Sequence, residues 1–494
     1  MKNINKFLLL FLTGLVIASC DENLDINVSP NAPGEINAGL ALTSAEANLA
    51  AVVGGEFMNL GGFYAQYHTQ SPSASQYENI DSYNLNTAYA NTPWTQLYAG
   101  VLTDLKYVTD ESAAAEDTAT LLIAEVLRGY TYQLLTDLFG DVPYTEALQM
   151  GNITPVVTPG EEIYADVIEK IDAAIAAYEA NPTESAAGAQ DVIFGSDMDM
   201  WIKFANTLKL RMYIRMAYTP QANPTATMAL VNEGNFLTSD AKFELFAEST
   251  DKRNPFYETF LSQTGLGDIN HIASNTIVNF YVANGDPRLG AAFRPGANGG
   301  YNSISQGTGN QFNDTAVAYA RPNVGPTTPV FLISAAESYF LQAEALIRYA
   351  SGTGAKEKYD AGVAASFSTY ANDFGLSGAS AGDFTGGGDV YEYQAGGGIE
   401  TEVRQVIIQK WASLAYVNNI EAYIESTRTK FPEVVAEGTE DYAAGNRIPS
   451  AISVLPGTTV PSVLFYPDDE VNRNPNITQK TSLTENVWWD QKPE

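Results

Sequence analysis

Cysteine and histidine are almost absent from this chain. Its 494 residues include one cysteine, Cys20, and two histidines, His68 and His271. A Cys–His nucleophile pair or a zinc site needs several such side chains, and no H-E-x-x-H motif is present. A serine nucleophile would have to use one of the two isolated histidines as its base. We therefore expect both histidines to be structural or surface residues, and we expect no cofactor and no metal at the functional site.

Basic residues are also scarce. The chain has 26 Lys and Arg against 58 Asp and Glu, a formal net charge of −32. Nucleic acids and anionic lipid surfaces are bound mainly through Lys and Arg, so we expect no nucleic acid partner and no docking on anionic lipid through a basic patch. The glycine-rich motifs of nucleotide-binding loops are absent as well. Hydrophobic residues make up 45% of the chain, which is enough for a sizeable core.

Residues 1–19 differ from the rest of the chain. Two lysines precede the apolar run FLLLFLTGLVIA, which is shorter than the roughly 20 residues needed to span a bilayer. Ala18 and Ser19 then come directly before Cys20. This order resembles the bacterial lipobox, whose cysteine carries the lipid. It predicts a lipoprotein signal peptide over 1–19 and lipidation of Cys20; the alternative is an ordinary signal peptide with an unrelated cysteine.

The remaining chain divides into a short tether and one large body. Residues 20–38 are polar and rich in Pro and Asn, which is typical of a flexible tether. Residues 39–494 contain no run of 18 apolar residues and are expected to form a single soluble domain.

Apolar periodicity predicts a mainly α-helical fold. Helices are expected over 91–108, 118–140, 161–180, 200–218, 334–350, 355–371 and 402–428, the last as one helix or a pair. Ser334 and Glu337 have the spacing of a capping box, and the helices after them form a hairpin that resembles a TPR unit. Three segments rich in Gly, Asn and Pro, 238–330, 372–400 and 433–494, predict a loop-rich face with short β-hairpins.

Aromatic and amide side chains are dense just before the first of these helices. Tyr67, Gln70, Tyr77 and Tyr83 lie in the stretch 67–89 among Ser and Asn residues. Aromatic rings stack on the apolar faces of sugars or peptides, and amides hydrogen-bond to hydroxyl groups or backbone. We interpret these four residues as a ligand-binding surface; the alternative is that individual rings pack the ends of helices.

Carboxylates leave an enzymatic alternative open. A glycoside hydrolase needs only two suitably spaced carboxyl groups, and 58 acidic residues supply many chance pairs. Asp197 and Asp199 lack the glycine and distal glutamate of a calcium loop, and we interpret them as the acidic first turn of a helix. No pair is singled out by the sequence.

Six short stretches occur along the chain in the order in which one family of proteins carries its motifs. They are LLTDLFGDVPYTEAL (134–148), NGDPRLG (284–290), SAAESYFLQAEAL (334–346), QKWASLAYVNNIEAYIESTRTKFPEV (409–434), YPDDEVNRN (466–474) and VWWD (487–490). Together with the lipobox they resemble the motifs of the SusD/RagB-type nutrient-binding outer-membrane lipoproteins of the Bacteroidota. Taken as residues, the motifs look structural: Asp137, Asp141 and Glu146 are placed to hydrogen-bond backbone around the turn after the 118–140 helix.

The resemblance implies a fold and a function. It implies a SusD-like helical scaffold and a non-enzymatic protein, anchored by lipid to the outer membrane and exposed at the cell surface. Such a protein captures an oligosaccharide or peptide and delivers it to a SusC-like TonB-dependent transporter. The acidic residues Asp21 and Glu22, directly after the lipid-bearing cysteine, resemble the surface-export signal of Bacteroidota lipoproteins.

Overall fold

The computed structural model describes residues 37–492. The predicted signal peptide, Cys20 and nearly all of the predicted tether lie outside the described residues. Residues from Ala38 onward form one compact unit. Its hydrophobic core extends from α2 at the amino end to Trp489 near the carboxyl end.

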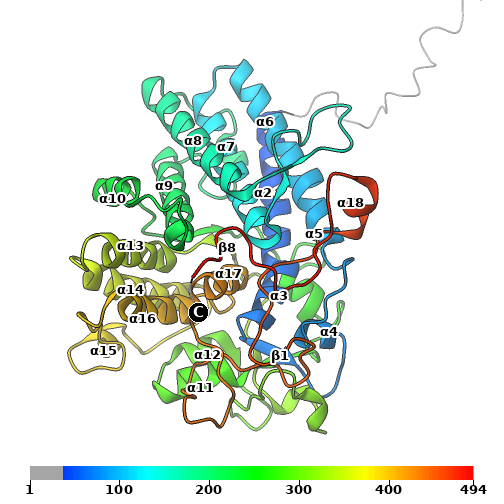
Figure 1. Cartoon of the computed structure of the whole chain (residues 1–494), viewed down its shortest axis with the longest axis vertical. Helices are drawn as coiled ribbons and strands as arrows, with labels where there is room; N and C mark the ends of the chain where they lie inside the picture. Colours follow the sequence, from blue (N-terminus) through cyan, green and yellow to red (C-terminus); the bar gives the residue numbers. More distant parts are fainter. Residues whose placement is uncertain (1–36, 493–494) are drawn as a thin grey trace, which may run out of the picture. The chain divides into compact units, whose positions relative to one another are not determined.

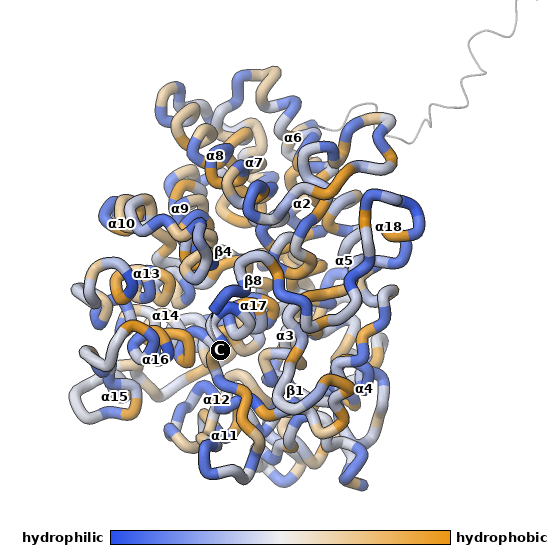
Figure 2. Tube along the Cα trace, in the orientation of Figure 1, coloured by the Kyte–Doolittle hydropathy of each residue, from blue (hydrophilic) through white to orange (hydrophobic). Residues whose placement is uncertain are grey.

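The strands of this unit are few and short, and helices make up about half of it (Figure 1). They are α2 (Ala38–Gly54), α3 (Glu56–Tyr64), α4 (Glu78–Asp81), α5 (Asn91–Thr95), α6 (Thr103–Ala114), α7 (Thr118–Phe139), α8 (Gly160–Ala180), α9 (Met198–Arg215), α10 (Pro224–Glu233), α11 (Asn275–Ala283), α12 (Arg288–Ala292), α13 (Ala335–Tyr349), α14 (Ala355–Asp373), α15 (Gly382–Thr385), α16 (Ile399–Ser413), α17 (Asn419–Thr429) and α18 (Asp468–Arg473). The mainly α-helical prediction is confirmed. Hydrophobic and hydrophilic residues alternate along the long helices (Figure 2).

The predicted helix boundaries hold where a strong local signal marks them. Gly140 follows the last residue of α7 with φ at +78°, a conformation that glycine adopts without strain. The predicted helix 402–428 is a pair. It breaks because Tyr416 adopts φ of +59° and the Asn418 side chain caps α17 by accepting from the Glu421 backbone N–H. Asp197 likewise caps α9, as its acidic first turn predicts.

Short antiparallel strand pairs tie the loops to the helices. The pairs are β1 (His68–Gln70) with β5 (His271–Ala273), β2 (Val142–Pro143) with β3 (Val157–Thr158), β4 (Ala241–Phe243) with β8 (Val330–Ile333), and β6 (Phe293–Arg294) with β7 (Arg321–Pro322). Two of them, β1–β5 and β4–β8, join segments far apart in the sequence. The β1–β5 pair fixes the position of the loops described below.

Nine buried charged residues meet where α7, α9, α13, α16 and α17 come together. We call them the central charge network: Asp137, Arg211, Arg215, Glu337, Glu344, Lys410, Glu421, Glu425 and Arg428. Arg215 lies at its centre. Its Nε donates to Asp137 Oδ2 at 3.1 Å, its Nη2 to Glu421 Oε2 at 2.8 Å, and its Nη1 to Glu425. Lys410 Nζ contacts carboxylates of Glu337, Glu421 and Glu425 at 3.1–3.3 Å.

Two sequence expectations change because of this network. Ser334 caps α13 as predicted, but the Glu337 side chain does not return to the cap: it receives two hydrogen bonds from Arg211, each 2.8 Å long. Asp141 and Glu146 do accept backbone N–H groups near the turn after α7. Asp137 does not, because its carboxylate is taken by Arg215 and by the Tyr164 hydroxyl and Trp489 indole.

Opposite charges set the protonation of these carboxyl groups. Burial alone raises the pKa of Glu421, but Arg215, Arg211 and Lys410 outweigh it and lower that pKa to about 2. Burial raises the pKa of Asp137 to about 6, against the opposing effect of Arg215. Glu344 has a further partner in Arg348, at 2.7 Å, so the five carboxylates of the network are balanced by its four cations together with this arginine.

We predict that Arg215→Met lowers the free energy of unfolding by ~3–5 kcal/mol, because it leaves three buried carboxylates without their shared cation. Urea unfolding followed by tryptophan fluorescence measures this. Lys106→Met is the matched control: it breaks the Lys106–Asp110 pair, whose side chains are 42% and 61% exposed, and its cost should stay below ~1 kcal/mol. Equal costs for the two variants would show that the network does not hold the helices together.

Candidate functional site

Three loops meet beside the β1–β5 pair, at the lower end of the unit in Figure 1. The Ser71 N–H donates to Asn270 O at 2.7 Å, and the Ala316 N–H donates to Ser73 Oγ at 3.1 Å. Residues 71–78, 262–270 and 305–319 thereby form one surface, which we call the loop face. It carries a hollow of about 320 Å³, lined by Gln70, Ser73, Ser75, Glu78, Asp81 and Asn310 among others.

Asp81 joins the walls of this hollow. Its buried carboxylate accepts hydrogen bonds from Thr69 Oγ1 at 2.7 Å, from Gln306 Nε2 at 2.6 Å and from the Gly307 N–H at 3.1 Å. Burial raises the pKa of Asp81 to about 6 although these hydrogen bonds oppose the rise. The side chain is fully occupied by these contacts, so it positions the loops and is not free to act on a ligand.

Gln70 has a comparable role in the 71–77 loop. Its Nε2 donates to Ala74 O at 2.8 Å, and its Oε1 accepts from the Tyr77 N–H at 2.8 Å. The amide group predicted to contact a ligand therefore also folds the loop that lines the hollow.

The three predicted tyrosine rings lie in the core and not on the loop face. Tyr67 is 0% exposed and its hydroxyl donates to Trp411 O. Tyr77 is 8% exposed and packs against Phe63, Phe260 and His271, and Tyr83 is 2% exposed beside Tyr64. The prediction that these three rings form an open binding surface is therefore wrong. The rings pack inward and hold the base of the loops.

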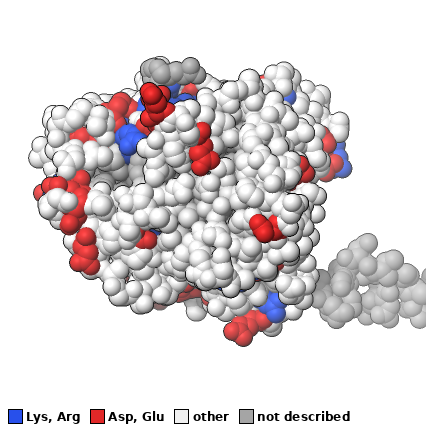
Figure 3. Space-filling view, turned by 90° about the horizontal axis from the view of Figure 1, so that it is seen from below, with Lys and Arg blue, Asp and Glu red and all other residues white. Residues whose placement is uncertain are grey.

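Other residues of the loop face are open to solvent. Asn310 and Gln311 are exposed, and Phe312 is 41% exposed. Leu266, Ile269 and Val317 are exposed apolar residues of the same loops. Sequence reasoning missed this set because 262–319 was recognised only as a loop-rich segment. Seen from below, this end of the molecule is largely uncharged, with scattered acidic groups (Figure 3), although the chain as a whole is strongly acidic.

Neither histidine is placed for catalysis. His68 and His271 are both fully buried, with ring centroids 4.8 Å apart, and both bond Asn59. Burial lowers the pKa of His68 to about 3. The stretch 378–382 has the G-x-S-x-G spacing of a nucleophile elbow, but Ser380 follows no strand and its hydroxyl accepts from the Gly382 N–H.

The described residues 37–492 contain no cluster of three or more His, Cys, Asp or Glu placed to hold a metal ion. Among them, no helix is both long enough and apolar enough to cross a bilayer.

Residues 30–453 match the SusD-like family described as starch-binding and associating with the outer membrane. The chain belongs to this family. Its members are outer-membrane-associated lipoproteins that bind nutrients and are not enzymes, so the glycoside hydrolase alternative loses its support. No curated protein sequence matches the chain.

Solved structures share the fold at low sequence identity. A SusD homolog from Bacteroides fragilis superimposes with a TM-score of 0.74 at 18% identity, covering 93% of this chain and 100% of its own. A chitin-binding SusD homolog from Flavobacterium johnsoniae has a TM-score of 0.74 at 19% identity, covering 92% and 99%. A homolog from Bacteroides thetaiotaomicron has a TM-score of 0.72 at 21% identity, covering 93% and 100%.

We predict that Gly309→Ala loosens the loop face. A Cβ at Gly309 would lie 2.7 Å from Gln70 O, a backbone atom that cannot move without disturbing β1. Limited proteolysis should therefore cut the 305–316 segment faster in this variant. Gly300→Ala is the control, because a Cβ there meets only side-chain atoms at 3.6–3.7 Å. Unchanged proteolysis in Gly309→Ala would contradict the close packing of this loop on β1.

Proposed function

We propose that this protein captures an oligosaccharide at the loop face and delivers it to a SusC-like TonB-dependent transporter in the outer membrane. The observation that carries the proposal is the hollow between the 71–78 and 305–319 loops, on a protein that belongs to a family of nutrient-binding lipoproteins. A peptide ligand is the second candidate, since the exposed groups of this face suit backbone amides as well.

The chemistry of the loop face favours a neutral sugar. Phe312 offers a half-exposed ring for stacking on a sugar face. Asn310, Gln311 and Ser75 are exposed and offer donors and acceptors for hydroxyl groups. The nearest polar side chains inside the hollow, Gln70 and Asp81, hold this arrangement fixed before a ligand arrives, which lowers the ordering cost of binding.

The predicted residues Tyr67, Gln70, Tyr77 and Tyr83 take a supporting role in this proposal. Gln70 lines the hollow, and its amide and the packed rings of Tyr67, Tyr77 and Tyr83 set where the 71–77 loop lies. Substitutions at these positions would change ligand affinity through the loop.

The transporter contact is proposed for the same end of the molecule. Leu266, Ile269 and Val317 are 41–48% exposed and surround a charge-poor surface. Exposed apolar residues grouped in this way are typical of protein interaction sites. A ligand held in the hollow would then face the transporter when the two proteins meet.

We predict that Phe312→Ala weakens oligosaccharide binding about tenfold, because the ring's stacking contact is lost. Isothermal titration with chito- and malto-oligosaccharides, and with short peptides in parallel, measures this and identifies the ligand class. Leu245→Ala, at a 64% exposed residue outside the loop face, should leave the affinity unchanged. Equal affinity in the wild type and Phe312→Ala would rule out the ring as a ligand contact.

We predict that Cys20→Ala abolishes lipid attachment and releases the protein from the detergent phase of a membrane extract. Membrane partitioning of Cys20→Ala like the wild type would refute the anchor.

A double variant, Asp21→Ala with Glu22→Ala, should keep the lipid but lose its surface exposure, so that protease added to whole cells no longer cuts it. Normal protease access to the double variant would refute the export signal.

A further inference from the structure

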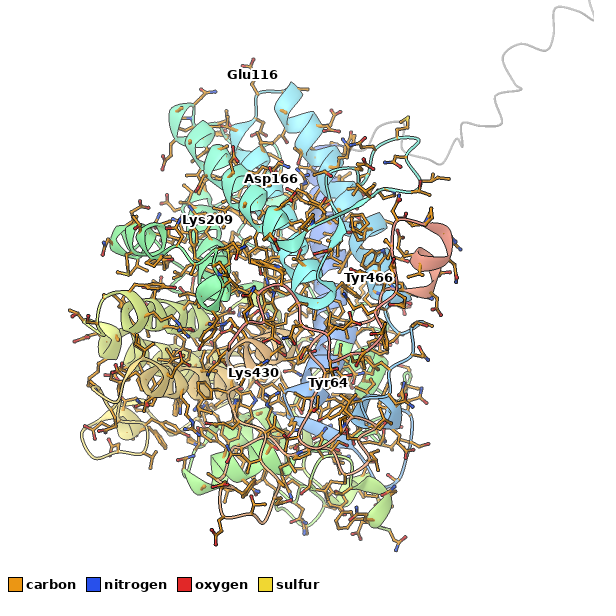
Figure 4. All side chains as sticks on the ribbon, in the orientation of Figure 1. Tyr64, Glu116, Asp166, Lys209, Lys430 and Tyr466 are labelled. Carbon is orange, nitrogen blue, oxygen red and sulfur yellow. The ribbon has the colours of Figure 1, made fainter. Side chains whose placement is uncertain are left out.

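A second hollow, which shares no lining residue with the first, lies beside the carboxyl end of α17. Its volume is about 360 Å³, and its walls come from the end of α17, from residues 458–462 and from the segment 484–486. Lys430, labelled near the middle of the view in Figure 4, is one of its lining residues.

The lining of this hollow is unusual for so acidic a chain. Six of its eleven lining residues are Ser or Thr, two are the cations Lys430 and Arg447, and none is Asp or Glu. Acidic residues outnumber basic ones by 58 to 26 in the sequence. A cavity wall without carboxylates, carrying two cations and many hydroxyl groups, has the composition of an anion site.

Arg447 adds a buried positive charge without a counter-ion. It is 2% exposed, and no carboxylate among the described residues lies within ion-pair distance of it. Its Nε donates to Pro432 O at 3.0 Å and its Nη2 to Ser426 O at 3.3 Å, which holds the end of α17. Its Nη1 is buried and has no hydrogen-bond partner in the described chain. The nearby Glu433 is bound by Arg404.

Hydrogen-bond donors in the same wall are also unused. The hydroxyl groups of Thr458, Thr459 and Ser462 make no hydrogen bond within residues 37–492. Lys430 Nζ donates to Asp490 Oδ1 at 2.7 Å, but the lysine side chain is 40% exposed and keeps two further N–H donors. The hollow therefore offers several donors and the buried charge of Arg447, while the charge of Lys430 is shared with Asp490, whose carboxylate is not among the lining residues.

The larger hollow between α6, α7 and α8 shows the contrast. It measures about 580 Å³ and contains Lys106, Arg128 and Lys170. Each of these cations is already paired with a carboxylate three or four residues away in its own helix, at 2.6–2.7 Å. Its charges are balanced within the protein, whereas that of Arg447 is not.

We propose that the hollow at Arg447 binds an anionic group, namely a sulfate, a phosphate or the carboxylate of an acidic sugar. The anion accepts hydrogen bonds from Thr458, Thr459 and Ser462 and is attracted by Lys430 and Arg447. This site is separate from the loop face, and its existence does not depend on the function proposed above.

Equilibrium dialysis with radiolabelled sulfate, at constant ionic strength maintained with chloride, tests the proposal. One saturable site is expected in the wild type. Thr458→Glu places a like charge at an exposed lining position and should weaken binding at least tenfold. Thr459→Val, which replaces a hydroxyl group by a methyl group of similar size, should weaken it about threefold. The control Thr225→Glu adds the same charge at an exposed first-turn position of α10 and should leave binding unchanged.

Competition identifies the source of the anion. Displacement of sulfate by glucuronate shows that the site admits the carboxylate of an acidic sugar, and displacement by phosphate alone shows a site for small oxyanions; neutral glucose should displace nothing. The proposal is overturned if the wild type has no saturable sulfate site, or if Thr458→Glu and Thr225→Glu reduce binding equally, since that would show only a general effect of net charge.

Discussion

Arg215 and the carboxylates around it are the contact on which the described structure depends. Burying nine charged side chains costs several kcal/mol for each ion unless every charge finds partners. The central charge network meets this demand by taking at least one residue from each of five helices. A charge on one helix is therefore compensated for its loss of hydration only when the helices that carry its partners are in place. The helices are thereby fixed relative to one another more strictly than hydrophobic packing alone would fix them.

The same constraint explains where the recognisable motifs lie. Asp137 belongs to the motif 134–148 that begins in the last turns of α7, Glu344 to the A-E-A stretch, Lys410 to Q-K-W, and Arg428 to the R-T-x-x-P turn. These residues are spread over the chain from position 137 to position 428 and meet in the network. The contacts that hold the helices together lie in the centre of the protein, so the surface loops are not needed for them. The loop face and most of the hollow at Arg447 are formed by such surface loops.

The sequence allowed the helices with strong periodicity to be predicted, but not α2, α3, α10 or α11, and it allowed the site to be predicted only in part. Ser334 and Gly140 act on their neighbours, so their capping roles are visible in a few residues. Glu337 pairs with Arg211, 126 positions earlier, and no pattern in the neighbouring residues predicts this pair. Tyr67, Tyr77 and Tyr83 were assigned to a surface because aromatic density is the same for rings that face a ligand and rings that fill a core. Phe312 carried no signal, since the exposure of a single ring in a loop-rich segment has no local pattern.

Trp489 ties the end of the described chain to its centre. Its indole N–H donates to Asp137 at 2.8 Å, joining the last described segment to a helix that ends at residue 139. Asp137 also accepts from Arg215, so the donors around this one buried carboxylate include a residue 352 positions later in the chain. The segment around residue 489 is thus part of the central charge network's surroundings and not an appendage to the helical body.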